Sequence, residues 1–263
     1  MATVQDVSDF LERFAPSRLA EEWDNVGLLV GDSKLTVRRV MTCLTVTPAS
    51  ADEATRENAD LIISHHPLPF QPLNRLTTDS VSGRLLWQLI RAGVSIHSPH
   101  TGFDSAAMGI NQRLAEGLGL LEIRPLVPGA DDPDGLGAGR FGKLEASLTL
   151  AECAYRLKEF LSIAGLHVVG RTTRPIQRVA VACGSAGSFL GAARRQGCEL
   201  LVTGETTFHT CLDASATDVA LLLPGHYASE RFAVEVLAEV LTEQFADLEV
   251  WASRDEADPL QWL

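Results

Sequence analysis

The sequence has no run of Lys and Arg residues, and its overall charge is acidic. Its 263 residues include 22 Lys and Arg against 34 Asp and Glu, for a formal net charge of −12. A general nucleic-acid binder needs a basic surface that neutralises phosphates, so we expect no direct nucleic-acid binding. A small anionic substrate stays compatible with the charge, because a bound dication or a local arginine cluster can reverse the field.

Paired cysteines are also missing. The chain has five cysteines, an odd number, and none of them forms a C-x-x-C pair. This spacing indicates neither a disulfide framework nor a structural zinc site. A catalytic thiolate at Cys183, which follows an apolar segment, is a weak alternative because no histidine lies next to it in sequence to activate it.

Long apolar runs are absent as well. No apolar stretch reaches the length that crosses a bilayer, and residues 1–6 lack the character of a signal peptide. We therefore expect a soluble, cytoplasmic protein without membrane contact. The chain has 263 residues, 46% of them hydrophobic, which is enough for one large domain or two ordinary domains with real cores.

What the sequence does contain is a regular alternation of strand and helix patterns. Helices are expected at 4–14, 49–58, 84–92 and 108–117, and strands at 38–45, 60–64 and 94–97. Strands that alternate with helices at this spacing are typical of an α/β fold with a largely parallel sheet.

Residues 125–142 interrupt this alternation with Pro, Gly and Asp. We interpret them as a linker between a first α/β subdomain at 1–124 and a second at 143–263, whose C-terminal segment can pack back onto the first. The segment contains G-x-G-x-x-G at 137–142, which also fits the start of a P-loop. Both matches are weak, because no apolar strand precedes them and Leu144 replaces the required Ser or Thr. A glycine-rich turn into a strand at 142–150 is the simpler interpretation.

The two halves repeat each other. Residues 39–41 correspond to 178–180, and 60–64 to 199–203, both at an offset of 139 positions. A further match pairs 99–104 with 225–230, each with a histidine followed four positions later by a carboxylate. Matches in the same order predict a duplicated α/β unit with a pseudo-twofold axis.

The histidine doublet at 65–66 follows a predicted buried strand. Ligands of open α/β sheets bind at the carboxyl ends of strands, and Pro67 keeps the preceding backbone extended. Taken alone, the doublet could be two unrelated histidines at a turn. Each histidine followed four positions later by a carboxylate could likewise be an ordinary surface pair. If the halves pack about the pseudo-twofold axis, the side chains converge on a site suited to two divalent metal ions. The ligand types are compatible with Zn, Mn, Fe or Ni. The converging set is His65, His66, Asp104, His226 and Glu230.

Six motifs, in order along nearly the whole chain, resemble those of the Nif-three-like family. They are W-D-N-V-G-L-L-V-G-D at 23–32, S-H-H-P-L at 64–68, H-T-G-F-D-S-A at 100–106, G-A-G-R-F-G at 137–142, T-G-E at 203–205 and G-H-Y-A-S-E-R at 225–231. Members of this family are also named GTP cyclohydrolase I type 2 homologues. The segment between the halves is too short for the domain that longer members insert there.

The resemblance implies a fold and an assembly. It implies two similar α/β subdomains related by a pseudo-dyad, largely in three α/β/α layers, and a toroidal homohexamer. It also implies a dinuclear metal centre in each subunit, held by the same five residues, with Glu230 as the bridge. His100 matches a family histidine that lies near the metals.

The implied activity is hydrolytic opening of the imidazole ring of GTP by a metal-activated water molecule. His100 and Glu205 are then candidate catalytic proton shuttles. Arg75, Arg140 and two further arginines at 171 and 174 are candidates for binding the triphosphate. Another hydrolase, acting on phosphoesters or amides, is a related alternative. An alternative of a different class is a metal-binding hexameric scaffold or regulatory protein that does not turn over GTP.

Overall fold

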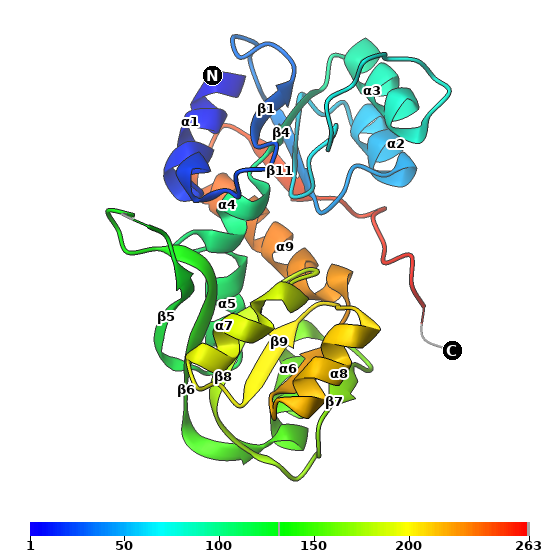
Figure 1. The fold of residues 1–263 in the computed structure, drawn as a ribbon. Coiled ribbons are helices and arrows are strands. Elements are labelled where there is room, and N and C mark those ends of the chain that lie inside the picture. The colour runs from blue at the N-terminus through cyan, green and yellow to red at the C-terminus, as the bar shows by residue number, and fades with distance from the viewer. Residues whose placement is uncertain (131, 262–263) are drawn as a thin grey trace. The chain divides into compact units, whose positions relative to one another are not determined.

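The computed structural model describes residues 1–130 and 132–261. The chain divides into two compact units, the first comprising 1–103 and 233–259 and the second comprising 104–232 and the C-terminal residues from 260. The boundaries fall inside helices α4 (His100–Ser105) and α9 (His226–Gln244). Each unit has its own β-sheet covered by helices, which confirms the predicted α/β fold (Figure 1).

The first unit contains a five-stranded sheet with the order β1-β4-β3-β2-β11. Its strands are β1 (Gly27–Val30), β2 (Arg39–Cys43), β3 (Leu61–Ser64), β4 (Ser95–Ser98) and β11 (Glu249–Ala252). Strand β1 is antiparallel to β4, and the other neighbours are parallel. The sheet therefore takes its last strand from the C-terminal end of the chain.

Helices cover both faces of this sheet. On one face, Met41 and Ile62 pack with residues of α2 (Pro48–Arg56) and α3 (Val81–Ala92). On the other face, the Thr42 hydroxyl donates to the carbonyl of Val234 in α9, 3.0 Å away. Helix α1 (Val4–Phe14) begins at a Thr3 capping box, as its Thr-x-x-Asp sequence favours, and is followed by the short helix η1 (Ser17–Leu19).

The second unit contains a six-stranded sheet with the order β5-β6-β8-β9-β10-β7. Its strands are β5 (Leu121–Pro128), β6 (Gly137–Thr149), β7 (His167–Val169), β8 (Pro175–Ala182), β9 (Leu200–Thr203) and β10 (Ala220–Leu223). Strands β8, β9 and β10 are parallel, and the remaining pairs are antiparallel.

This sheet is also the middle of three layers. Val179 and Leu200 pack on one face with Leu114 of α5 (Ile110–Gly117) and Leu157 of α6 (Leu150–Leu161). The opposite face packs against α8 (Phe208–Ala216) and against α7 (Leu190–Arg195), which follows the short helix η2 (Gly187–Phe189). In the part of the chain that the structure describes, no helix is both long and apolar enough to cross a bilayer.

The predicted repeat is present in the strand registers. Val40 of β2 lies opposite Leu61 of β3, and Val179 of β8 lies opposite Leu200 of β9. Each pair is separated from its counterpart by the offset of 139 positions found in the sequence. The duplication therefore extends to the pairing of individual residues.

A carboxylate just before β3 has an equivalent just before β9 in the other unit. Asp60 accepts hydrogen bonds from the backbone N–H groups of residues 38 and 39 at 2.8 and 2.9 Å. Glu199, at the equivalent position, accepts from the N–H groups of residues 177 and 178 at 3.2 and 2.6 Å. Both carboxylates thus hold the start of the preceding strand in register.

The predicted linker at 125–142 is wrong. Apart from residue 131, which lies outside the described residues, this segment contains most of β5 and the start of β6, which pair as an antiparallel hairpin. Its glycines permit close backbone approach, since a Cβ on Gly137 would lie 2.2 Å from the carbonyl oxygen of Val127. The G-x-G-x-x-G spacing therefore serves strand packing in this unit.

Arg140, within that motif, is buried. Its guanidinium uses all five N–H donors inside the second unit, which makes it a structural side chain and corrects its candidacy for the triphosphate. The acceptors are the carbonyls of residues 105, 106, 137 and 139, at 2.7–2.8 Å, and the side chain of Gln112 at 3.0 Å.

In the first unit, Glu53 of α2 forms hydrogen bonds with β11 and with the residues that follow it. Its buried carboxylate accepts hydrogen bonds from Trp251, Ser253 and the backbone N–H groups of Arg254 and Asp255, at 2.6–3.0 Å. Burial alone would raise the pKa of Glu53, but these hydrogen bonds outweigh it and lower the pKa.

Replacing Glu53 with glutamine is expected to lower the free energy of unfolding at pH 7 by about 2 kcal/mol, because a neutral amide replaces an acceptor of charge-assisted hydrogen bonds. A folded-state pKa below the unfolded value gives stability that is present at neutral pH and lost on acidification. The wild type should therefore lose more stability than Glu53→Gln as the pH falls below the ordinary glutamate range. Urea denaturation at several pH values measures both effects, and substitution of the exposed Glu22 with glutamine is the control. If the stability of the wild type and of Glu53→Gln depended on pH in the same way, the role given to Glu53 would be contradicted.

Candidate metal centre

The histidine doublet continues the parallel pairing of β3 beyond the end of the strand. The N–H of His65 donates to the carbonyl of Cys43 at 2.9 Å, and that of His66 donates to the carbonyl of Leu44 at 2.8 Å. The Ser98 hydroxyl, at the end of β4, donates to the carbonyl of His65 at 2.7 Å. The sequence prediction that the sheet presents both imidazoles at the tip of β3 is therefore confirmed.

His100 joins this doublet in the first unit. The ring centroids of His65 and His66 are 5.1 Å apart, and His100 lies 5.1 Å from the first and 5.6 Å from the second. One ring nitrogen from each of the three lies within 4.8 Å of the others, which would allow them to hold one metal ion. We call them the three-histidine cluster. His100 has φ near +25°, a costly conformation for a residue other than glycine, of the kind found where a site fixes the backbone.

Two of the three imidazoles are fixed through Nδ1. His66 Nδ1 lies 2.7 Å from the Thr45 hydroxyl, and His100 Nδ1 lies 2.7 Å from Oδ1 of Asp24. Metal-binding histidines are commonly held by such a bond from the ring nitrogen that does not face the metal. A metal ion bound to either ring would therefore be held through Nε2.

The side chain of Asp24 is buried, and its carboxyl group is ionised. It also accepts hydrogen bonds from the backbone N–H and the hydroxyl of Thr101. Burial alone would raise the pKa of Asp24, but the bonds from His100 and Thr101 lower it to about 2. The sequence analysis missed Asp24 as a functional residue. Its only signal was a position in the polar turn of the W-D-N-V-G motif.

The second unit presents a histidine and two carboxylates. Nε2 of His226 lies 3.1 Å from Oε2 of Glu230, one turn later in α9, and its Nδ1 lies 2.9 Å from Glu205. Glu230 and Glu205 raise the pKa of His226 to about 9, with Glu230 contributing most, although burial opposes the rise. A divalent cation would compete with this proton for the same imidazole and carboxylate.

Asp104 accepts a hydrogen bond from Cys183, whose thiol lies 3.1 Å from Oδ1. Burial raises the pKa of Cys183 well above its ordinary value, and the negative charges of Asp104 and Glu230 raise it further. The thiol is therefore protonated at neutral pH, which argues against the catalytic thiolate. Because the charges of both carboxylates act on the same thiol, Asp104 and Glu230 both lie near Cys183 in this unit.

Two glycines make room for the start of α9. A Cβ on Gly184, which has φ of +63°, would lie 2.3 Å from Oε1 of Glu230. A Cβ on Gly204 would lie 2.5 Å from the Ser229 hydroxyl and 3.0 Å from Cα of His226. Gly204 occupies the position equivalent to His65 in the repeat, so the helix start excludes a second histidine doublet there.

The chain is similar to known proteins along nearly its whole length. The profile of the family described as Duf34/NIF3 (NGG1p interacting factor 3) matches residues 2–259. The chain belongs to this family. A Clostridium acetobutylicum protein named GTP cyclohydrolase 1 type 2 homolog is 34% identical over 238 residues, covering 90% of this chain and 89% of that protein. A Helicobacter pylori protein named GTP cyclohydrolase 1 type 2 is 33% identical over 245 residues, covering 92% of each.

The fold of this family member is also that of solved relatives. The crystal structure of a Bacillus cereus protein related to NIF3 matches with a TM-score of 0.90 at 23% identity, covering 100% of this chain and 99% of that one. The predicted resemblance and the two-unit α/β fold are thus both confirmed. Within the units, the structure groups His65 and His66 with His100, and it places Asp104 and Glu230 around Cys183. The assignment of all five predicted ligands to one dinuclear centre stays a prediction.

Proposed function

We propose that this Duf34/NIF3 protein is a metal-dependent hydrolase that opens the imidazole ring of GTP. The observation that carries the proposal is the fixed orientation of three imidazoles: His66, His100 and His226 each engage Nδ1 in a hydrogen bond, and Nε2 of His226 lies beside the carboxylate of Glu230. The names of the Clostridium and Helicobacter relatives support the reaction.

The donor set fits divalent cations. Imidazole nitrogens with carboxylate oxygens suit Zn, Mn, Fe or Ni, and two ions bound there would supply Lewis acidity and a lowered pKa for water. We assign the ions to the five residues that the sequence indicated, with Glu230 as the bridge. They are His65, His66, Asp104, His226 and Glu230.

The two candidate proton shuttles have different roles in this proposal. Asp24 holds Nδ1 of His100, so Nε2 of His100 is left to accept and return a proton at the substrate. Glu205 is half exposed and bonds Nδ1 of His226. We therefore assign Glu205 to positioning that imidazole and His100 to proton transfer.

An exposed aromatic pair beside the three-histidine cluster favours a purine over a phosphoester or amide substrate. Trp23 is 60% exposed and Phe70 is 49% exposed, with ring centroids 6.1 Å apart and 6.0 and 6.2 Å from His100. The Asn25 amide donates to the carbonyl of Pro69 at 2.8 Å and ties the two loops together. Such a fixed aromatic surface suits the stacking of a planar base.

Replacing Trp23 with alanine is expected to raise KM for GTP about 10-fold, because stacking on an aromatic side chain is worth roughly 1–3 kcal/mol per base. Steady-state kinetics on metal-loaded protein measures this change. Trp87, which is 48% exposed on α3, provides the matched control Trp87→Ala. If both variants keep the wild-type KM, the aromatic pair does not bind the base.

The reaction itself is tested by the absorption change that accompanies conversion of the purine chromophore to a pterin-type one. Purified protein of known metal content should convert GTP, and chelated protein should not. Absence of conversion with two metal ions per chain would reject the reaction. It would favour the alternative of a metal-binding scaffold, which the family description as an interacting factor supports. We further propose a toroidal homohexamer, which light scattering showing a monomer in metal-loaded protein would reject.

A further inference from the structure

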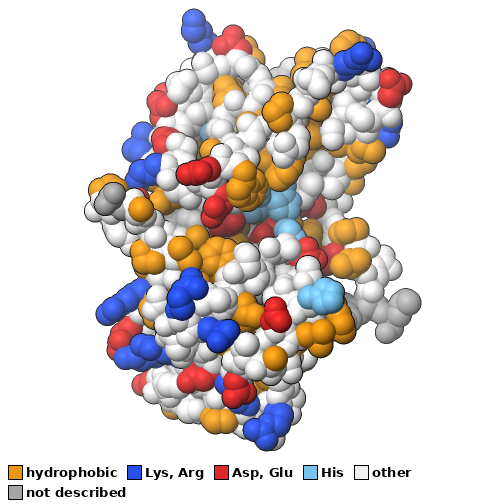
Figure 2. Space-filling model, viewed as in Figure 1, with side chains coloured by type: hydrophobic (Ala, Val, Ile, Leu, Met, Phe, Trp, Pro, Cys, Tyr) orange, Lys and Arg blue, Asp and Glu red, His pale blue; other side chains and the backbone are white. Residues whose placement is uncertain are grey.

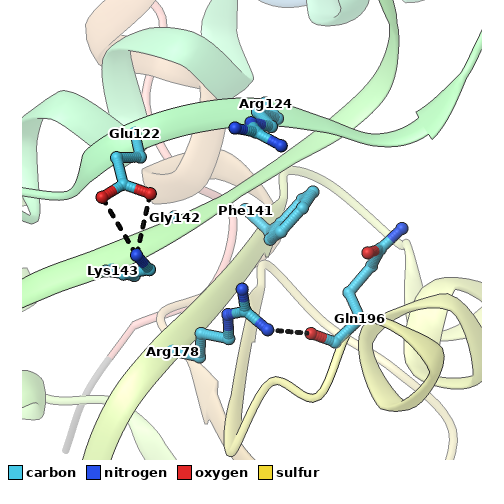
Figure 3. A pocket seen from close by; sticks show the side chains of 7 residues that line it. All are labelled: Glu122, Arg124, Phe141, Gly142, Lys143, Arg178 and Gln196. Carbon is cyan, nitrogen blue, oxygen red and sulfur yellow. Dashed lines mark hydrogen bonds and ion pairs between the residues drawn. The ribbon is translucent and has the colours of Figure 1, made fainter.

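A cavity in the second unit is lined by none of the predicted metal ligands. It lies over strands β5, β6 and β8 near the end of α7 and has a volume of about 210 Å³ (Figure 3). Its lining residues are Glu122, Arg124, Phe141, Gly142, Lys143, Arg178 and Gln196.

The strand registers place the basic side chains of this cavity on one face of the sheet. Arg124 lies opposite Phe141, and Lys143 lies opposite Arg178. Phe141 and Lys143 are two positions apart on β6, so both project from the same face. Figure 3 shows the side chains of Arg124 and Arg178 on either side of the Phe141 ring. Three adjacent strands thus place three cations on one face of the sheet, and two of them, Arg124 and Arg178, flank the Phe141 ring.

The cavity carries excess positive charge in an acidic protein. Glu122 pairs with Lys143 at 2.8 Å, and this contact lowers the pKa of Glu122, with smaller contributions from Arg124 and Arg178. Among the described residues, no carboxylate forms an ion pair with either arginine. On the face drawn in Figure 2, Lys and Arg side chains gather over the part of this unit where β5, β6 and α7 lie.

Arg178 is already oriented. One of its N–H groups donates to the carbonyl of Gln196 at 3.1 Å, and its guanidinium carbon lies 6.0 Å from the centre of the Phe141 ring. A guanidinium fixed in this way keeps other donors in a planar fork that matches the oxygens of a phosphate. We propose that the cavity binds the phosphate group of a small phosphorylated compound, between Arg124 and Arg178.

Calorimetric titration with inorganic phosphate tests this site on the full chain after removal of metal by chelation, so that the predicted metal centre contributes no phosphate binding. Binding should weaken at least 10-fold in the double variant Arg124→Ala/Arg178→Ala. The matched control Arg13→Ala/Arg91→Ala removes two exposed arginines of the first unit and should keep the wild-type affinity. Circular dichroism checks that each variant is folded.

A second variant keeps the test decisive if the alanine pair does not fold. Arg124→Lys/Arg178→Lys keeps both charges and loses the planar forks, so it should also bind phosphate more weakly than the wild type. Sulfate should displace phosphate, and acetate at equal concentration should not. No binding at 10 mM phosphate, unchanged affinity in the arginine variants, or displacement by acetate would overturn the proposal.

Discussion

Replacing His66 with alanine is expected to remove one of the two proposed metal ions and to lower GTP turnover by at least ~100-fold. His66 presents Nε2 because the Thr45 hydroxyl engages its Nδ1, and loss even of groups that only orient a ligand costs about 10–100-fold in affinity or activity. Metal analysis after gel filtration and the purine-to-pterin absorption assay measure the two effects. His167 lies exposed in edge strand β7, so His167→Ala is the matched control and should change neither.

Both readouts are needed, because metal binding stabilises the folded state by mass action. A lower melting temperature in His66→Ala would therefore occur with either a catalytic or a structural metal. Retention of two ions per chain by the variant would contradict the assignment of His66. Loss of an ion with unchanged turnover would contradict the catalytic role and leave a structural metal site.

Replacing Arg140 with methionine is expected to lower the free energy of unfolding by about 4 kcal/mol. The side chain is 1% exposed and donates five hydrogen bonds, and methionine would leave four buried carbonyls and the Gln112 side chain without this donor. Each buried acceptor left unsatisfied costs roughly 1–3 kcal/mol, less what water and local relaxation recover. Urea denaturation followed by circular dichroism measures the loss.

Arg113 offers a matched comparison for this substitution. It lies on α5 in the same unit, is only partly buried, and donates to the carbonyl of Met108 at 2.9 Å. Arg113→Met should cost less than ~1 kcal/mol, as expected for a surface side chain. Equal losses in the two variants would show that the buried hydrogen bonds of Arg140 contribute little to the stability of the second unit.

Much of the fold could be predicted because its signals are local. The helix expected at 4–14 has those bounds, since its apolar spacing and its capping box lie within one short stretch. The duplication was visible because Asp60 and Glu199 begin equivalent strands at the same offset, and the registers of both sheets preserve it. The histidine doublet was found because a buried strand leads directly into it.

Other features depend on residues that are far apart in sequence. Asp24 and His100 are separated by 76 positions, and no periodicity connects a turn before β1 to the start of α4. The segment 125–142 has the composition of a loop, yet its glycines let two strands approach closely. The sequence makes Arg140 a candidate for binding phosphate because its charge is visible there, whereas the backbone carbonyls that surround its guanidinium are not.

We propose that ligands from both repeats bind one pair of metal ions. Anomalous diffraction from crystals of metal-loaded protein, recorded at the absorption edge of the bound metal, tests it most directly. The account predicts two peaks roughly 3.5–4 Å apart, the spacing of two-metal sites, with Glu230 in contact with both. The ligands should be His65, His66, Asp104, His226 and Glu230. A single ion bound only to His65, His66 and His100, with Glu230 free of metal, would contradict the account.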